Sequence, residues 1–276
     1  MLSNPRSERV RAARRLAGRS ARTRAGAFLA EGPRAVREAV SAGAVRELFV
    51  TVEAGGRHRE IVESARAQGF AVRYSTAEVL AEIADTVTPQ GLVAVCSFVD
   101  RALDDVLIAR PSLFAALARV QDPGNAGTVI RAADAAGADA VVLTHGSVDV
   151  YNPKCVRSTA GSLFHLGLVT GAPLEAVVEH ARGAGLGVLA ADGAGPVDLD
   201  DLLDDAEHGT GPLVAPAMWV FGNEAQGLSA AEAGLADAVV RVPVHGRAES
   251  LNLATAATVC LYASARALRR RPPPSP

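Results

Sequence analysis

A series of short apolar segments recurs along the C-terminal part of the chain, and helical stretches separate them. Most of these segments are apolar at nearly every position, without the alternation of a strand that has one face in water. Continuous apolar strands are typical of a parallel sheet covered by helices on both faces, so the pattern predicts an α/β fold. The expected strands are residues 113–120, 140–144, 163–169, 187–191, 217–221 and 239–242.

The same alternation occurs on a smaller scale nearer the N-terminus. There, strands are expected at 47–52, 70–74 and 91–98, with helices at 33–41, 58–68 and 76–84. Further along, helices are expected at 125–136, 153–160, 174–182 and 252–270. Polar residues and a proline interrupt the alternation between 100 and 111. We therefore expect one domain over residues 1–105, a second over 112–270, and a disordered tail over 271–276.

Arginine is concentrated at the N-terminus. Residues 1–37 contain ten arginines against Glu8 and Glu31, a net charge of +8, whereas the other 239 residues carry −10. Guanidinium groups pair bidentately with phosphate, so this asymmetry favours a polyanion partner. A solvated basic helix or a coding bias towards arginine is the alternative, since Lys154 is the only lysine in the chain. The candidate contacts are Arg15, Arg19, Arg22 and Arg24.

Several functional classes are excluded by what the sequence lacks. No apolar run reaches the roughly 18 residues of a transmembrane helix, and the polar, arginine-rich start is unlike a secretory signal. The three cysteines and six histidines show no metal-ligand spacing. Neither a phosphate-binding GxxxxGK[ST] loop nor a GxSxG nucleophile turn is present. The expectation is a cytoplasmic protein without a bound metal.

Three polar loops follow expected strands, and the first covers residues 122–131. Asn125 can cap the helix that follows, and two glycines in this loop allow another backbone to approach closely. Arg131 lies six positions further, in an otherwise apolar helix. Two interpretations are open: Asn125 is only a cap and Arg131 reaches solvent, or both belong to a site.

The other two loops cover residues 221–228 and 242–252. Glycine-containing loops at the carboxyl ends of parallel strands are where α/β sheets bind ligands. In the second loop, Glu224 can be an acid, a hydrogen-bond acceptor or a first-turn helix residue. In the third, Ser250 can be the N-cap of the last helix, or part of a site with Asn252.

Together, the three loops resemble the signature motifs of the SpoU/TrmH family of RNA 2′-O-ribose methyltransferases, in the SPOUT superfamily. The family pattern Asp-Pro-x-Asn-x-Gly-x-x-x-Arg matches 122–131, and Phe-Gly-x-Glu-x-x-Gly-Leu matches 221–228. The third motif matches 242–253, with Val244 in place of methionine and Leu253 in place of valine. The N-terminal part is similar to the substrate-binding domain of rRNA-modifying members, which has a small ribosomal-protein-like α/β fold.

The resemblance implies a C-terminal parallel sheet with a deep trefoil knot, S-adenosylmethionine as cofactor, no metal, and a homodimer formed through the catalytic domains. It also implies an RNA substrate, with 23S rRNA favoured over tRNA by the two-domain layout. The cofactor-binding positions that it implies are Ala191, Gly222, Gly227, Val242 and Leu251.

Methyl transfer needs a positioned hydroxyl, its deprotonation and an in-line sulfonium methyl. The resemblance places Arg131 at the hydroxyl. Because a guanidinium stays protonated, we expect Arg131 to stabilise the developing alkoxide, with the proton relayed onward, rather than to act as a simple base. The catalytic residues implied are Asn125, Arg131, Glu224, Ser250 and Asn252.

Two other functional classes are weighed against this one. An RNA-binding relative that has lost catalysis is disfavoured by the intact set of polar residues in the three loops. A nicotinamide-dependent dehydrogenase is disfavoured because its glycine-rich first loop is missing.

Overall fold

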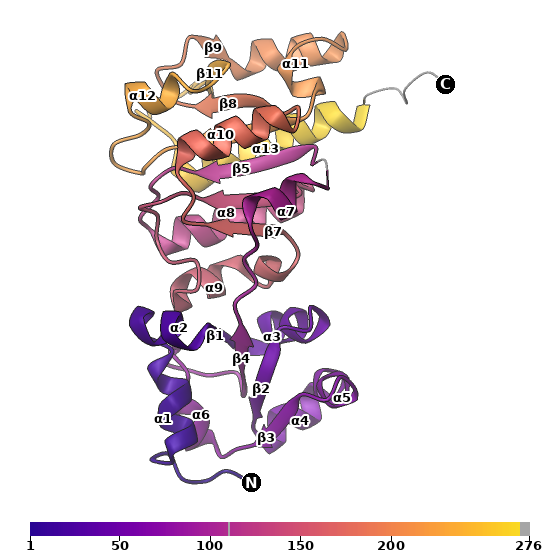
Figure 1. The fold of residues 1–276 in the computed structure, drawn as a ribbon, viewed down its shortest axis with the longest axis vertical. Helices are drawn as coiled ribbons and strands as arrows, with labels where there is room; N and C mark the ends of the chain where they lie inside the picture. The colour runs from indigo at the N-terminus through magenta and orange to yellow at the C-terminus, as the bar shows by residue number, and fades with distance from the viewer. Residues whose placement is uncertain (110, 271–276) are drawn as a thin grey trace. The chain divides into compact units, whose positions relative to one another are not determined.

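The computed structural model describes residues 1–109 and 111–270, so the tail expected at 271–276 lies outside the described residues. The chain forms two units (Figure 1). Unit 1 consists of Met1–Val99 together with Asp149–His165, and unit 2 consists of the rest. Neither unit is a single continuous stretch of sequence, because residues 149–165 interrupt unit 2 along the chain and pack within unit 1.

Unit 2 is built on a sheet of seven strands among the described residues, in the order β7-β6-β5-β10-β8-β11-β9. All neighbouring strands run parallel, which confirms the α/β class expected from the continuous apolar segments. The strands are β5 (Leu113–Leu117), β6 (Ala140–Leu143), β7 (Gly167–Thr170), β8 (Gly187–Ala191), β9 (Val197–Asp198), β10 (Ala217–Phe221) and β11 (Ala238–Arg241).

The helices of unit 2 cover both faces of this sheet. They are α7 (Leu103–Leu107), α8 (Pro123–Ala136), α10 (Leu174–Gly183), α11 (Leu199–Glu207), α12 (Ala230–Ala233) and α13 (Leu253–Arg270). On one face, Met218 and Val220 of β10 pack in the same core cluster as Val177 of α10. On the other, buried Trp219 donates from Nε1 to Ser264 Oγ on α13 at 2.9 Å. Alternate residues of β10 thus serve opposite cores, which is why the strand is apolar throughout.

Some expected boundaries are wrong, both in unit 2 and in residues 149–165 of unit 1. Asn125 does not begin α8: Asp122 is the N-cap and accepts from the Asn125 amide at 2.8 Å, with Pro123 in the first turn. Residue 163 is not in a strand, because Ser162–Phe164 forms a short 3₁₀ turn and β7 begins only at Gly167. The N-cap sets the boundary in the first case and the 3₁₀ turn sets it in the second, and the apolar pattern reveals neither.

Unit 1 contains a four-stranded sheet in the order β1-β4-β2-β3, in which only β2 and β3 run parallel. The strands are β1 (Ala27–Glu31), β2 (Val45–Val50), β3 (Ala71–Tyr74) and β4 (Leu92–Ser97). The helices are α1 (Glu8–Arg15), α2 (Arg19–Ala25), α3 (Gly32–Ser41), α4 (Val52–Arg57), α5 (Arg59–Ala67), α6 (Ala77–Ile83) and α9 (Pro153–Thr159). A small α/β unit was expected here, although α1, α2 and α4 subdivide it more finely.

Aromatic packing of Tyr151 and the buried ion pair between Asp149 and Arg22 hold residues 149–165 in unit 1. Tyr151 stacks on Phe98 with 4.0 Å between ring centroids and lies 4.6 Å from Phe28. Its hydroxyl accepts from the Val99 amide at 2.8 Å. These contacts bury Tyr151 almost completely, and Cys155, Val156 and Thr159 of the following α9 are buried as well.

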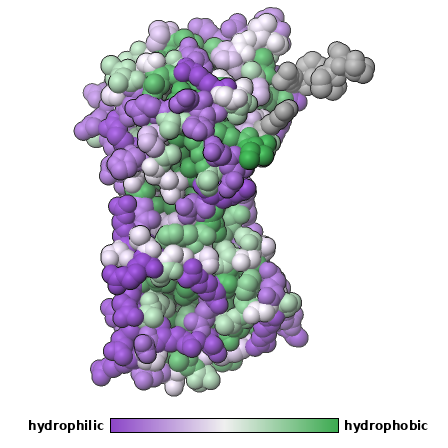
Figure 2. Space-filling view, in the orientation of Figure 1, coloured by the Kyte–Doolittle hydropathy of each residue, from purple (hydrophilic) through white to green (hydrophobic). Residues whose placement is uncertain are grey.

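The visible surface carries hydrophilic residues over most of its area, with smaller hydrophobic areas between them (Figure 2). Within residues 1–109 and 111–270, no helix has the length and apolar character needed to cross a lipid bilayer.

Candidate active site

A pocket of about 620 Å³ lies in unit 2, beyond the carboxyl ends of β8, β10 and β11. Its wall includes residues from the second and third loops and the first residues after β8. A volume of this size is in the range of roughly 300–1,000 Å³ that small-molecule sites occupy. All five positions expected to bind a cofactor line this one pocket: Ala191, Gly222, Gly227, Val242 and Leu251.

The first loop contributes from the edge of the pocket rather than from its wall. Because Asp122 caps α8, the side chain of Asn125 is available for other contacts. Asn125 Nδ2 donates to Glu224 Oε1 at 3.3 Å, and Asn125 Oδ1 accepts from Asn252 Nδ2 at 3.1 Å. Asn125 therefore links all three loops.

Glu224 acts as an acceptor in this arrangement. Its carboxylate accepts from the amides of Gln121 at 3.1 Å and Asp122 at 3.0 Å, as well as from Asn125. Partial burial raises the pKa of Glu224, but the hydrogen bonds from these backbone amides outweigh it and leave the pKa below its ordinary value. Of the three roles open from the sequence, the ionised acceptor fits the structure, and a general acid does not.

The second loop is a tight turn that closes on itself. The amide of Asn223 donates to the Gly227 carbonyl at 3.1 Å, and the amide of Gly227 donates back at 2.8 Å. A Cβ atom at Gly222 would lie 2.4 Å from the carbonyl carbon of Gly227, and Gly227 itself has φ 64°. Both positions therefore require glycine, and the turn presents backbone atoms to the pocket.

The third loop leads into α13, and its cap differs from the expectation. Asn252, not Ser250, is the N-cap: its Oδ1 accepts from the amides of Ala254 at 2.9 Å and Thr255 at 3.4 Å. Ser250 is exposed and lines the pocket, with no hydrogen bond to another described residue. The cap is two residues later than Ser250, so Ser250 is not used as a cap and lines the pocket.

Arg131 is not brought to this pocket within the single chain. It is an exposed residue in the middle of α8 and is not part of the pocket wall. Six residues along a helix correspond to about 9 Å of rise and a rotation of roughly 120° away from Asn125, so the two side chains leave different faces of α8.

The four arginines expected to contact RNA lie in unit 1, and the structure separates one of them from the rest. Arg15, Arg19 and Arg24 are exposed. Arg22 is 2% exposed, and its guanidinium donates to the carbonyls of Leu16 and Ala17 and to Asp149 Oδ2 at 2.6 Å. The expectation that Arg22 binds RNA is therefore corrected, because its donors are used inside the fold.

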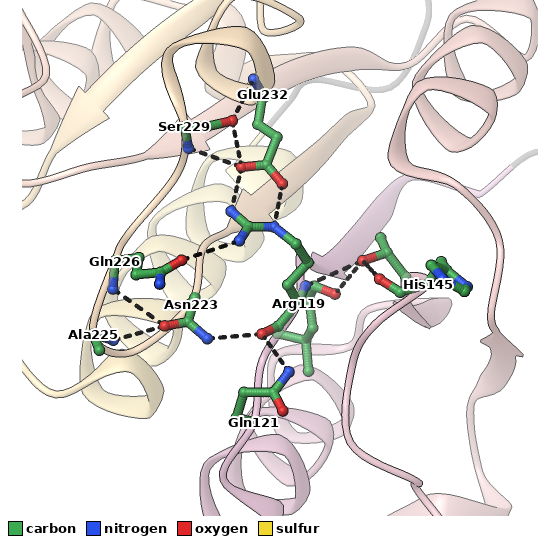
Figure 3. A network of polar contacts seen from close by, with 10 residues as sticks. Arg119, Gln121, His145, Asn223, Ala225, Gln226, Ser229 and Glu232 are labelled. Atoms are coloured by element: carbon green, nitrogen blue, oxygen red, sulfur yellow. Dashed lines mark hydrogen bonds and ion pairs between the residues drawn. The ribbon is translucent and has the colours of Figure 1, made fainter.

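Two residues near the pocket went unnoticed in the sequence. Arg119 follows β5 and pairs with Glu232 of α12, as Figure 3 shows. The only available signal was a charged residue inside the apolar segment 113–120, and it did not indicate a partner 113 residues away. Within residues 1–109 and 111–270, no cluster of three or more His, Cys, Asp or Glu side chains could hold a metal ion.

Comparison with known families covers most of the chain. Residues 112–262 match the SpoU rRNA Methylase family, and residues 7–94 match the MRM3-like substrate binding domain.

Two curated relatives are similar to the chain over nearly its full length. The 23S rRNA (guanosine(2553)-2′-O)-methyltransferase of Bacillus subtilis is 33% identical, covering 95% of this chain and 97% of that protein. The 23S rRNA (uridine(2479)-2′-O)-methyltransferase of Streptomyces viridochromogenes is 34% identical, covering 96% of each.

Solved structures agree with this grouping. An AdoMet-bound rRNA methyltransferase from Sinorhizobium meliloti superposes with a TM-score of 0.84 at 31% identity, covering 97% of both chains. The SpoU methyltransferase AviRb from Streptomyces viridochromogenes, in complex with AdoMet, gives a TM-score of 0.81 at 33% identity, covering 97% of this chain and all of that one. With its three loops around one pocket, and with matches over nearly its whole length, the chain belongs to the SpoU rRNA methylase family.

Proposed function

We propose that this protein transfers a methyl group from S-adenosylmethionine to a ribose 2′-hydroxyl of ribosomal RNA, with 23S rRNA as the substrate. The observation that carries the proposal is the Glu224–Asn125–Asn252 chain of hydrogen bonds, which joins all three loops beside a pocket of suitable size. The similar proteins named above, two of them 23S rRNA 2′-O-methyltransferases, support the choice of substrate.

The pocket suits this cofactor by the chemistry of its wall. Apolar side chains such as Val242, Leu251 and Leu253 can enclose a flat base, while the backbone at Gly222 and Gly227 is open to close approach. The carboxylates of Asp192 and Glu249 also line the pocket and can accept hydrogen bonds from hydroxyl and ammonium groups. When bound, S-adenosylmethionine supplies a sulfonium methyl group for transfer.

The polar chain of residues would orient the ribose. Asn252 and Asn125 each use one amide atom in their mutual bond, so their remaining polar atoms are the groups available to the target nucleotide. Glu224, held ionised by backbone donors, fixes Asn125 in place. Ser250, exposed at the pocket wall, is a further polar contact for substrate.

We assign to Arg131 the stabilisation of the alkoxide that forms as the hydroxyl loses its proton, with the proton passed on to a substrate phosphate. Since Arg131 is exposed and is not part of the pocket wall of its own chain, we propose that the protein acts as a homodimer through unit 2. Val259 and Tyr262, three residues apart on α13 and 38% and 49% exposed, support this as apolar contacts for a second copy.

Unit 1 is proposed to bind RNA, through Arg15, Arg19 and Arg24. Because the substrate is ribosomal RNA, we place the reaction in the cytoplasm. The deep trefoil knot implied by the resemblance is proposed for the end of unit 2. The insertion of β10 between β5 and β8, which both precede it in the chain, supports this proposal.

Mapping of 2′-O-methyl positions tests the function directly. Purified protein would be incubated with S-adenosylmethionine and either ribosomal RNA or transfer RNA, and the methylated nucleotides located. We expect one new 2′-O-methyl position, in 23S rRNA. Methylation of transfer RNA alone would overturn the substrate, and binding of both cofactor and ribosomal RNA with no transfer to either RNA would show a relative that has lost catalysis.

A further inference from the structure

Arg119 has an unusual backbone conformation. Its φ is 55°, and among the described residues only Ala160 is another non-glycine residue with a positive φ. This left-handed region is disfavoured for residues with a side chain, and such conformations persist where surrounding contacts hold them. Arg119 lies two residues after β5, just before the first loop.

Its backbone is fixed from both sides. The amide donates to Thr144 Oγ1 at 3.2 Å, and the carbonyl accepts from Asn223 Nδ2 at 2.9 Å and from Gln121 Nε2 at 3.1 Å (Figure 3). The bond from Asn223 is the important one here, because Asn223 begins the tight turn of the second loop. The backbone of Arg119 therefore anchors the start of that turn.

The side chain of Arg119 reaches the middle and the end of the same loop. Its Nε donates to Glu232 Oε1 at 2.8 Å and its Nη2 to Oε2 at 2.6 Å, a bidentate ion pair. Its Nη1 donates to Gln226 Oε1 at 3.4 Å. The Glu232 side chain is only 13% exposed, so this pair is partly shielded from water.

Glu232 is itself built into the loop's far end. Its Oε2 accepts from the amide and the hydroxyl of Ser229, both at 2.8 Å, and its own amide donates to Ser229 Oγ at 3.2 Å. This reciprocal capping begins α12. One arginine is therefore bonded to the loop at Asn223, at Gln226 and, through Glu232, at Ser229.

We propose that Arg119 is a positioning residue, which holds the loop from Gly222 to Ser229 in the shape that binds the cofactor before the cofactor arrives. The inference rests on the proposed function for the identity of the ligand, S-adenosylmethionine. Asn223, Gln226 and Gly227 line the pocket, so loss of the arginine contacts loosens part of the cofactor site. A preformed loop avoids an ordering cost on binding.

The experiment compares three substitutions at one position. Arg119→Met removes the ion pair, Arg119→Lys keeps the charge without the planar fork, and Arg119→Gly suits the backbone but lacks the side chain. We expect the methionine and glycine variants to bind S-adenosylmethionine roughly tenfold more weakly in calorimetry, and the lysine variant to fall between them and wild type. The maximal rate at saturating cofactor should change less than about threefold, and the KM for RNA should stay unchanged.

A control removes an ion pair of similar chemistry elsewhere in unit 2. Arg266 donates to Glu207 at 2.7 Å, and neither residue lines the pocket. Arg266→Met should leave cofactor affinity at the wild-type value. If it weakened binding as much as Arg119→Met, the effect would be one of general stability and the proposal would fail.

Hydrogen exchange of the protein without cofactor gives a second measurement. The amides of Gln226 and Gly227 should exchange about tenfold faster in Arg119→Met and Arg119→Gly than in wild type, with the β5 amides unchanged. Wild-type exchange and wild-type affinity in these variants would overturn the proposal. A wild-type protein that bound no S-adenosylmethionine would defeat the proposed function alone, since the exchange measurement still decides whether Arg119 orders the loop.

Discussion

Asn252 and Asn125 stand 127 residues apart in the chain and share a hydrogen bond of 3.1 Å between their side-chain amides. Each residue also serves a helix, since Asn252 caps α13 and Asn125 lies in the first turn of α8. The bond therefore connects the starts of two helices that pack together against the same face of the sheet. A site built from two helix starts is held by the rigid core beneath it.

Asn252→Asp separates the catalytic from the structural use of this residue. Aspartate keeps the cap on α13, so the melting temperature should hardly change. It has no N–H to give to Asn125, and turning the Asn125 amide would set its oxygen against Glu224. We expect the rate of methyl transfer to fall roughly a hundredfold, measured by single-turnover kinetics. Asn252→Ser should behave alike, and normal rates in both would remove Asn252 from the site.

Arg131→Ala should abolish methyl transfer and leave the affinity for S-adenosylmethionine nearly intact, because Arg131 is not part of the pocket wall. Arg131→Lys should retain partial activity if charge stabilisation is the main contribution. The measurements are transfer of labelled methyl groups and calorimetry. Arg266→Ala is the control, because Arg266 is also an exposed arginine of unit 2 and does not line the pocket. Half or more of the wild-type rate in Arg131→Ala would show that the assigned role is wrong.

Stability in acid should depend on Glu232. Its hydrogen bond from Arg119 lowers the pKa of Glu232 to about 2, against a value of 4.5 without such contacts. A lowered pKa stabilises the fold fully above pH 4.5, and the stabilisation is lost as the pH falls from about 4.5 towards about 2. Glu232→Gln should therefore cost roughly 1–3 kcal/mol of unfolding free energy at pH 7, and clearly less at pH 3.

Urea unfolding of the wild type and of Glu232→Gln at several pH values measures the difference in their unfolding free energies directly. All other titrating groups are common to the two proteins, so the change in their difference with pH reports on Glu232. Curves that stay parallel from pH 7 to pH 3 would show that the pKa of Glu232 is not lowered by folding.

Substitution of Arg22 should lower the stability of the fold, whereas substitution of its exposed neighbours should lower the affinity for RNA. Arg22→Met leaves Asp149 without its buried partner and should cost roughly 3–5 kcal/mol of stability. The combined change of Arg15, Arg19 and Arg24 to alanine should leave the melting temperature close to wild type. RNA affinity should then fall, and the negative slope of log affinity against log salt concentration should become shallower by roughly 2–3.

Filter binding at several salt concentrations and calorimetric melting test both halves of this contrast. An unchanged salt slope in the triple variant would remove these arginines from the RNA-binding surface. An Arg22→Met protein as stable as wild type would contradict the role given to the buried ion pair.

The sheet of unit 2 and the pocket could be predicted from the sequence because both depend on local patterns. Apolar runs mark strands with two buried faces, and a short polar loop after such a strand marks the ligand-binding edge. The five cofactor positions, which the family resemblance implied, all line this pocket. The family resemblance added the chemistry, which no periodicity contains.

What could not be predicted depends on partners far away in sequence. A basic helix does not reveal which arginine turns inward, because the carboxylate that decides it, Asp149, is 127 residues from Arg22. Arg119 was missed for the same reason. The caps of α8 and α13 were displaced by three and two residues, because several nearby side chains, such as Asp122 and Asn125, can each serve as cap. Short elements like β9 and α12 lie below the length at which a pattern is recognisable.

The return of residues 149–165 to unit 1 also orders events during synthesis. Arg22, Phe28 and Phe98 leave the ribosome early, but Asp149 and Tyr151 follow only after β5, α8 and β6 have been made. Until then, unit 1 lacks the carboxylate that pairs with Arg22 and the Tyr151 ring of its aromatic core, while part of unit 2 has already left the ribosome. Synthesis of unit 2 begins before unit 1 is complete, so the nascent chain completes the two units in an interleaved order rather than one after the other.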